Sequence, residues 1–147
     1  MYELGATCVT DAVVEAVRDW MPDAEVCVEA GQAGARPYFF VEQMERHTTG
    51  QERRGRIKRF YYDYLMNVRY YGGAGELKEV ELGLERALRE LEMWGGLVET
   101  TNRKGRLAQG DGMVDFSFNV PVYEDAVPLA TEKVERLDVK GVELGET

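Results

Sequence analysis

Two segments of the chain alternate apolar and polar residues with a period of two, which is typical of β-strands with one buried face. The longer one runs from Lys58 to Tyr71. Strands usually have about five or six residues, so we expect this one to project beyond the sheet, as one arm of a hairpin with a preceding strand at residues 37–44. The other segment spans residues 113–122. Its Pro121 lacks an N–H, so this end should lie at a sheet edge or beyond the ladder.

Two other segments repeat their apolar residues every three or four positions, as amphipathic helices do. We predict a first helix over residues 10–21, ended by Pro22. The second is predicted over residues 76–94, ended by Gly95 and Gly96.

Two shorter strands and two turns complete the pattern. We expect strands at residues 25–29 and 97–101, and turns at residues 102–105 and 111–112. The order of helix, strands, helix and strands predicts an α+β fold. In this fold a mostly antiparallel sheet carries two helices packed on one face and a long projecting hairpin.

Length and composition fit one domain, because the chain has 147 residues, of which 44% are hydrophobic and 31% are charged. We expect a single α+β domain over residues 1–124 and an acidic C-terminal tail over residues 125–147. The tail either adds a strand to this sheet or to a neighbour, or stays mobile until a neighbour orders it. The sequence has no apolar run long enough for a membrane span and no secretory leader, which predicts no membrane association and synthesis in the cytosol.

Residues that usually carry catalysis or bind metals are few. The chain has two cysteines, Cys8 and Cys27, and a single histidine, His47. A structural zinc site generally uses four ligands, so we expect free buried thiols and a surface histidine instead. Asp63 and Asp115 lie within predicted strands, with no nucleophile or base at a recognisable spacing. The sequence therefore predicts no catalytic residue, no metal and no cofactor.

Charge is distributed unevenly along the chain, whose net charge is −9. Residues 46–59 contain six cations and one acid, a net +5, so the other 133 residues carry −14. The six cations are our candidate interface residues: Arg46, Arg53, Arg54, Arg56, Lys58 and Arg59.

Three interpretations of this basic segment are open. It is a solvated hairpin loop whose like charges keep it extended, or it contacts nucleic-acid phosphates, or it binds an acidic surface on another copy of the chain. Contacts between unlike faces of identical molecules close into rings when the rotation permits. We favour the contact between copies.

The order of these segments resembles the bacteriophage tail terminator (tail completion) family of tailed phages and related prophage elements. The matching features are the opening amphipathic helix, the segment from Pro37 to Val41, and the arginine-rich approach to an aromatic strand. A helix, the strand from Val114 to Val120 and an acidic C-terminus then follow in the family's order. The likeness covers roughly residues 10 to 140.

The segment from Tyr64 to Tyr71 is similar to the family's aromatic–Pro–Phe–Asp–Ile–Arg–aromatic–aromatic stretch. It departs from that stretch at two positions: Leu65 stands in place of the proline, and Asn67 in place of the acid. An electrostatic role of the family's acid is therefore not expected at position 67.

The resemblance implies a structural virion protein that forms a ring, typically a hexamer, on the last ring of the tail tube. Such a ring stops tube growth and offers a surface for head–tail joining. The implied partners are other copies of the chain, the tail tube protein, head–tail connector proteins and genomic DNA that passes through an acidic lumen without specific binding. The implied location is the neck region of the virion, after synthesis in the host cytoplasm.

Two alternatives remain at the level of sequence. One is another head–tail connector or neck protein of similar size. The other, from a different class, is a small nucleic-acid-binding module that uses the cluster from Arg53 to Arg59.

Overall fold

The computed structural model describes residues 6–29, 34–93 and 96–126. Helix α1 (Ala6–Trp20) comes first, followed by strands β1 (Glu25–Cys27), β2 (Tyr38–Arg54) and β3 (Ile57–Tyr71). A 3₁₀ turn, η1 (Ala74–Glu76), leads into helix α2 (Leu77–Ala87), and strands β4 (Glu90–Met93) and β5 (Gly96–Glu99) come next. Strand β6 (Thr101–Ala108), the 3₁₀ turn η2 (Gln109–Asp111) and strand β7 (Met113–Ala126) complete the described chain.

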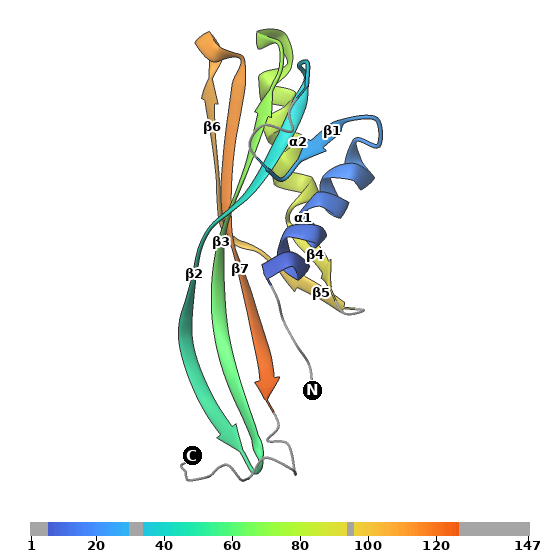
Figure 1. The fold of residues 1–147 in the computed structure, drawn as a ribbon. Helices are drawn as coiled ribbons and strands as arrows, with labels where there is room; N and C mark the ends of the chain where they lie inside the picture. The colour runs from blue at the N-terminus through green and yellow to red at the C-terminus, as the bar shows by residue number, and fades with distance from the viewer. Residues whose placement is uncertain (1–5, 30–33, 94–95, 127–147) are drawn as a thin grey trace.

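The main sheet has the strand order β1-β2-β3-β7-β6, and all its pairs are antiparallel except β1 with β2. Strands β4 and β5 form a separate antiparallel pair. Both helices lie on the same side of the main sheet, and its long strands continue past them (Figure 1). The predicted α+β fold, with a mostly antiparallel sheet and two helices on one face, is confirmed.

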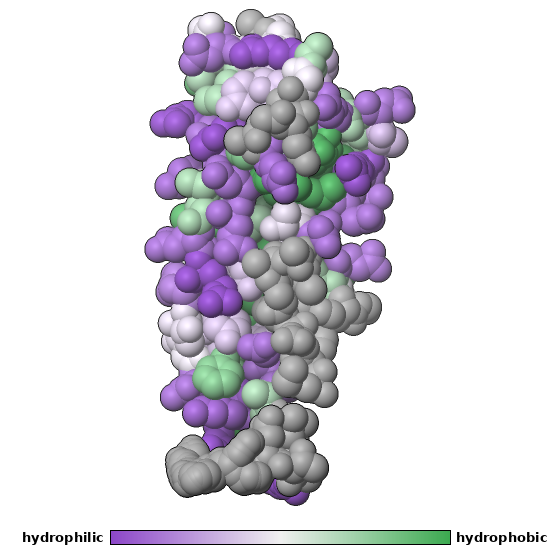
Figure 2. Space-filling model, in the orientation of Figure 1, coloured by the Kyte–Doolittle hydropathy of each residue, from purple (hydrophilic) through white to green (hydrophobic). Residues whose placement is uncertain are grey.

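The hydrophobic core lies between this sheet face and the two helices. Tyr64, Met66, Val68 and Tyr70 of β3 are fully buried or nearly so, which confirms the alternation seen in the sequence. Phe116 and Phe118 of β7, Val13 and Val17 of α1, and Leu84 of α2 close the core from its other sides. The face shown in Figure 2, by contrast, is largely hydrophilic.

The hairpin of β2 and β3 is much longer than the core requires. The two strands pair from Tyr38 opposite Tyr71 to Arg54 opposite Ile57, so only Gly55 and Arg56 form the turn. Gly55 has φ +63°, a conformation that suits glycine because a Cβ atom is strained there. Residues 46–59 are therefore strands joined by a tight turn, and the part of our expectation that made them a loop is wrong.

The far half of the hairpin carries only one further strand. β7 follows β3 as far as Ala126 opposite Lys58, whereas the pairing of β6 with β7 stops at Asn119. Pro121 lies beyond the last residue of β7 that pairs with β6. Among the described residues, no β6 residue is therefore left without a hydrogen bond from its nitrogen, as the sequence predicts. We call this three-stranded part, residues 44–62 of β2 and β3 with residues 120–126 of β7, the hairpin end.

The second helix is shorter than predicted, since it ends at Ala87 rather than near residue 94. Leu91 and Met93 are buried on β4 while the glutamates beside them are exposed, a period of two that the helical pattern concealed. The last carbonyl groups of a helix need partners outside it. At the end of α2, the hydroxyl of Thr100 donates a 2.6 Å hydrogen bond to the carbonyl oxygen of Leu88. Gly95 lies outside the described residues, and Gly96 begins β5 instead of ending a helix.

The turn predicted at residues 102–105 is also wrong. Those residues belong to β6, which pairs with β7 through a register shift between Thr101 and Lys104. Asn102 has φ +53° and lies in this bulge. The residues that we predicted to form a turn therefore form a bulge within the strand. The turn at residues 111–112 is present, and Gly112 has φ +62°.

Candidate subunit interface

All six candidate cations lie on the hairpin end, and the strand register divides them between its two faces. Arg46 pairs with Tyr64, and Arg53 pairs with Lys58, so these three cations share the face that carries the core further along the sheet. Arg54 and Arg59 lie on the opposite face with their register partners, and Arg56 is in the turn. Cations thus lie on both faces of this end of the sheet, together with the acids Glu45, Glu52, Glu124 and Asp125.

Arg59 is held inside the chain. Its Nε and an Nη atom donate hydrogen bonds of 2.7 and 2.9 Å to the two carboxylate oxygens of Asp125, and its guanidinium lies 4.0 Å from the centre of the Tyr123 ring. Hydrogen bonding to Arg59 lowers the pKa of the Asp125 carboxyl, and the same pairing raises the pKa of Arg59. This bidentate pair fastens the end of β7 to β3.

Arg54 also has an acidic partner, because its Nε lies 3.3 Å from a carboxylate oxygen of Glu52. The hydroxyl of Tyr61 donates a hydrogen bond to the same carboxylate. The hydrogen bond from Tyr61, followed by that from Arg54, lowers the pKa of Glu52. Two of the six cations are therefore paired with carboxylates of their own chain.

The other four cations have no carboxylate partner among the described residues. Arg46 lies over the ring of Tyr62 at 5.1 Å, and Lys58 lies over the ring of Phe60 at 5.4 Å. Arg53 and Arg56 are exposed, and within the described part of the chain the side chain of neither forms an ion pair, a hydrogen bond or a ring contact. They are the cations most available to a partner.

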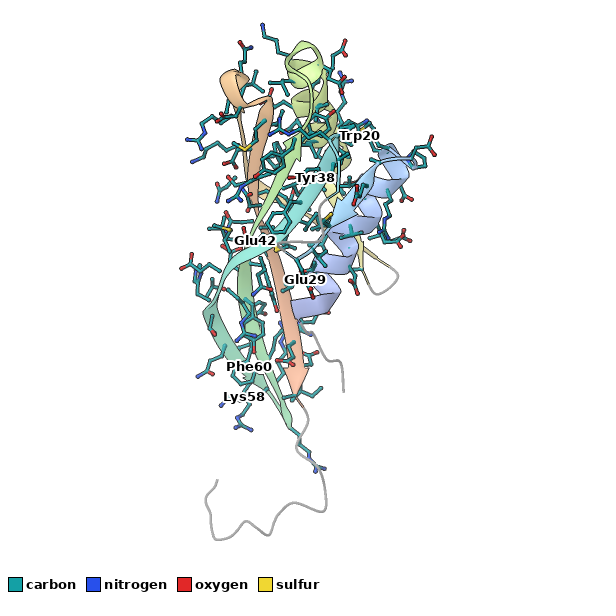
Figure 3. All side chains as sticks on the ribbon, turned by 45° about the horizontal axis from the view of Figure 1, so that its top comes forward. Trp20, Glu29, Tyr38, Glu42, Lys58 and Phe60 are labelled. Atoms are coloured by element: carbon teal, nitrogen blue, oxygen red, sulfur yellow. The ribbon has the colours of Figure 1, made fainter. Side chains whose placement is uncertain are left out.

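The opposite charge lies on the helix layer. Residues 6–29 and 74–99, which contain both helices and the β4–β5 pair, have thirteen acidic residues and four basic ones, a net −9. In Figure 3, Trp20 at the end of α1 lies well away from Lys58 and Phe60 on the hairpin end. The positive and negative surfaces therefore occupy different parts of the molecule, as contacts between unlike faces require.

The described residues that we considered as catalytic or metal-binding candidates lie at the surface, in the interior or in hydrogen bonds between strands. His47 is exposed on β2, and Cys27 is a buried free thiol whose pKa is raised by burial, while the side chain of Cys8 lies outside the described residues. Asp63 accepts a hydrogen bond from Asn119, and Asp115 accepts one of 2.6 Å from Asn67.

Among the described residues, no three His, Cys, Asp or Glu side chains cluster in a way that could hold a metal ion. In the same part of the chain, no helix is both long enough and apolar enough to cross a bilayer.

Sequence reasoning located the cations but missed the acids that hold two of them. Asp125 lies 66 residues from Arg59 in the chain, and only the β3–β7 register brings the two together. Glu52 was visible within the basic segment, but residues 46–54 are polar apart from a glycine, so no alternation marked the strand that places Glu52 beside Arg54.

An α+β chain with a basic hairpin end and an acidic helix layer has the surfaces of an assembly component. The model of a phage tail terminator protein family matches residues 9–132, so the chain belongs to this family, as its sequence suggested. It is therefore a structural protein of the phage tail, in a family that is not a class of enzymes.

Two solved structures are similar to the chain. A chain in the virion of a native gene transfer agent particle is 16% identical, with 81% of this chain and 97% of that chain covered and a TM-score of 0.49. A second solved chain is 15% identical, with 88% and 100% covered and a TM-score of 0.41. The comparison with curated proteins gave no match.

Proposed function

We propose that copies of this chain form a homo-oligomeric ring, a hexamer, that caps the tail tube, stops its polymerisation and provides the surface for head–tail joining. The family places the chain in the phage tail. The observation that supports a ring is the separation of Arg53 and Arg56, whose side chains are exposed and have no partner among the described residues, from the acidic helix layer. Each copy thus offers one face of each sign, as a head-to-tail ring requires.

The proposal extends to partners and place. The ring contacts the tail tube protein on one side and head–tail connector proteins on the other, in the neck region of the virion after synthesis in the host cytoplasm. Genomic DNA passes through the lumen without specific binding, and the chain performs no enzymatic reaction. The excess of acid over base, −9 for the whole chain, favours sliding of DNA over gripping.

Contact between copies is better supported than nucleic-acid binding by the cluster from Arg53 to Arg59. Bases stack on open aromatic faces in single-strand binding sites. At the hairpin end, cations already lie over the rings of Phe60, Tyr62 and Tyr123. Of the six cations of the hairpin end, only Arg53 and Arg56 are exposed and have no ion pair, side-chain hydrogen bond or ring contact with a described residue, and two phosphate contacts give weak binding.

Electron microscopy of tails assembled without this protein tests the capping role. Because the ring ends polymerisation, its removal should give tubes of uncontrolled length. Tubes of normal length that lack heads would contradict termination and favour the neck-protein alternative.

A charge-reversal variant tests the interface. Arg53→Glu with Arg56→Glu should abolish rings in native mass spectrometry, in the presence of tail tubes, while the monomer stays folded by circular dichroism. The matched control is Lys104→Glu with Arg106→Glu, which makes the same charge change at exposed positions of β6, outside the hairpin end and the helix layer, and should assemble like the natural chain. Unchanged rings in the first variant would remove the hairpin end from the interface.

A further inference from the structure

A groove of about 520 Å³ lies on the helix side of the molecule, where α1 passes the end of α2 and the β4–β5 pair. Trp20 and Leu97 contribute apolar surface to it, and Leu97 is 68% exposed. Its acidic lining residues are Glu15 and Asp19 of α1, and Glu90 and Glu92 of β4.

The groove combines uncompensated negative charge with an apolar surface. No basic residue lines it, and none of its four carboxylates forms an ion pair or a hydrogen bond with another described residue. Glu90 and Glu92 point outward because Leu91 and Met93, which alternate with them on β4, are buried in the core. A concave surface lined by one sign of charge concentrates its field on a cationic partner.

We propose that this groove receives the hairpin end of the neighbouring copy, an assignment that rests on the proposed ring and names its contact. The tip of the hairpin carries the matching groups: Arg53 and Arg56 have exposed side chains that are unpaired within the described chain, and Ile57, on the face of the sheet opposite to Arg53, is 38% exposed. The tip therefore enters the groove end-on. The two guanidinium groups face the carboxylates, and Ile57 packs against Trp20 and Leu97. The match is thus one of charge and of apolar surface together.

The contact is between copies because the hairpin end and the groove are far apart within one chain. Lys58 and Phe60 lie toward the end of the hairpin, away from Trp20 at the groove (Figure 3). From Tyr64, the last fully buried residue on this part of β3, the strand continues for seven residues to Ile57. At about 3.3 Å per residue this is a reach of roughly 23 Å, enough to enter an adjoining molecule.

Side chains, rather than added strands, make this contact. Strand β2 has register shifts between Gln43 and Glu45 and between Thr48 and Gly50, and β7 has Pro121 where the β6 ladder has ended. Bulges and proline are features that hinder edge-to-edge pairing. The strand edges of the hairpin end are therefore poor templates for a neighbour's strand, which favours docking through the turn.

A mixing experiment with full-length chains and tail tubes tests the assignment. The hairpin variant is Arg53→Glu with Arg56→Glu, and the groove variant is Glu15→Lys with Glu92→Lys. Each alone should associate at least about tenfold more weakly than the natural chain. An equimolar mixture should recover assembly, because the reversed turn then meets the reversed groove. Sedimentation velocity and native mass spectrometry measure the assemblies.

Two controls keep the experiment interpretable. Asp11→Lys with Glu79→Lys reverses two exposed acids outside the groove and should assemble normally. Glu15→Gln with Glu92→Gln removes the charges with less risk to folding and should weaken assembly without being rescued by the hairpin variant.

The outcomes separate the two proposals. A natural chain that neither self-associates nor caps tubes overturns the ring itself. A natural chain that assembles, together with a groove variant that assembles equally well or a mixture that recovers nothing, overturns only the groove assignment. Equal impairment of the Asp11 and Glu79 control also overturns it, because total charge then explains the effect.

Discussion

Polar side-chain contacts add to strand pairing in the hairpin end, where only Val120 and Val122 among the described residues belong to the buried core. Arg59 joins β3 to Asp125 of β7, and Tyr61 and Arg54 both bind Glu52 of β2. On one face of the sheet, the Tyr61–Glu52 and Arg59–Asp125 contacts join β3 to β2 and to β7, and the Arg54–Glu52 pair lies within β2. The geometry of the projecting end therefore depends on a few carboxylates remaining ionised.

Acidification should loosen the hairpin end through Asp125. Its pKa is lowered in the folded chain, so its stabilising contribution is complete above the unfolded value of about 3.9 and is lost as the pH falls through the lowered value. We expect Asp125→Asn to be less stable than the natural chain at pH 7 and to lose less stability between pH 5 and pH 2. Thermal unfolding at each pH measures this, and parallel curves for the two chains would contradict it.

Tyr64 should be replaceable by phenylalanine with a gain in stability. Its side chain is fully buried, and its hydroxyl has no hydrogen-bond partner among the described residues. Removing a buried, unsatisfied hydroxyl should stabilise the chain by about 1 kcal/mol in urea unfolding. Tyr62→Phe is the control, because the Tyr62 hydroxyl donates a 2.9 Å bond to Glu124, and this variant should lose stability instead.

At the scale of elements, the sequence predicted β3 and β7 well, only the first half of β2, and the second helix poorly. β3 is within one residue of its prediction because one set of alternate positions is consistently apolar. α2 was extended too far because Leu88 and Leu91 fit a helical spacing as well as they fit the end of a helix followed by β4. Short apolar runs do not distinguish the two periods.

The candidate subunit interface could be predicted only in part, because some of its contacts join segments that are distant in the sequence. The six cations are close in sequence, so their clustering did not depend on the fold. The pairing of Arg59 with Asp125 and the groove between α1 and β4 both depend on register and packing between distant segments. Periodicity within one segment carries no information about either.

Packing between the helices predicts a specific cost at Gly83 of α2. A Cβ atom there would lie 1.9 Å from Cζ2 of Trp20 on α1. Gly83→Ala should destabilise the chain by about 1–3 kcal/mol through overpacking, despite alanine's better helix propensity. Urea unfolding measures the change, and Gly73→Ala is the control because nothing lies within 4 Å of its added atom. A more stable Gly83 variant would contradict the packing.

For the whole molecule, the division of charge makes assembly dependent on salt. The Debye length falls from about 10 Å at 0.1 M to about 3 Å at 1 M. We expect ring formation to weaken over this range while monomer stability changes little, because the core is apolar. Sedimentation velocity and thermal unfolding at matched salt concentrations test both parts. Rings that persist unchanged at 1 M salt would show a contact dominated by apolar surface.

The hairpin end continues past both helices (Figure 1), and we expect it to open separately from the rest of the chain. Amide protons of residues 64–70 on β3 lie over the core and should exchange with deuterium only when the whole domain unfolds. Amides of residues 50–60 should exchange far sooner, through fraying that leaves the core intact. If the proposed ring forms, amide exchange in the hairpin end should slow when a neighbouring copy binds it.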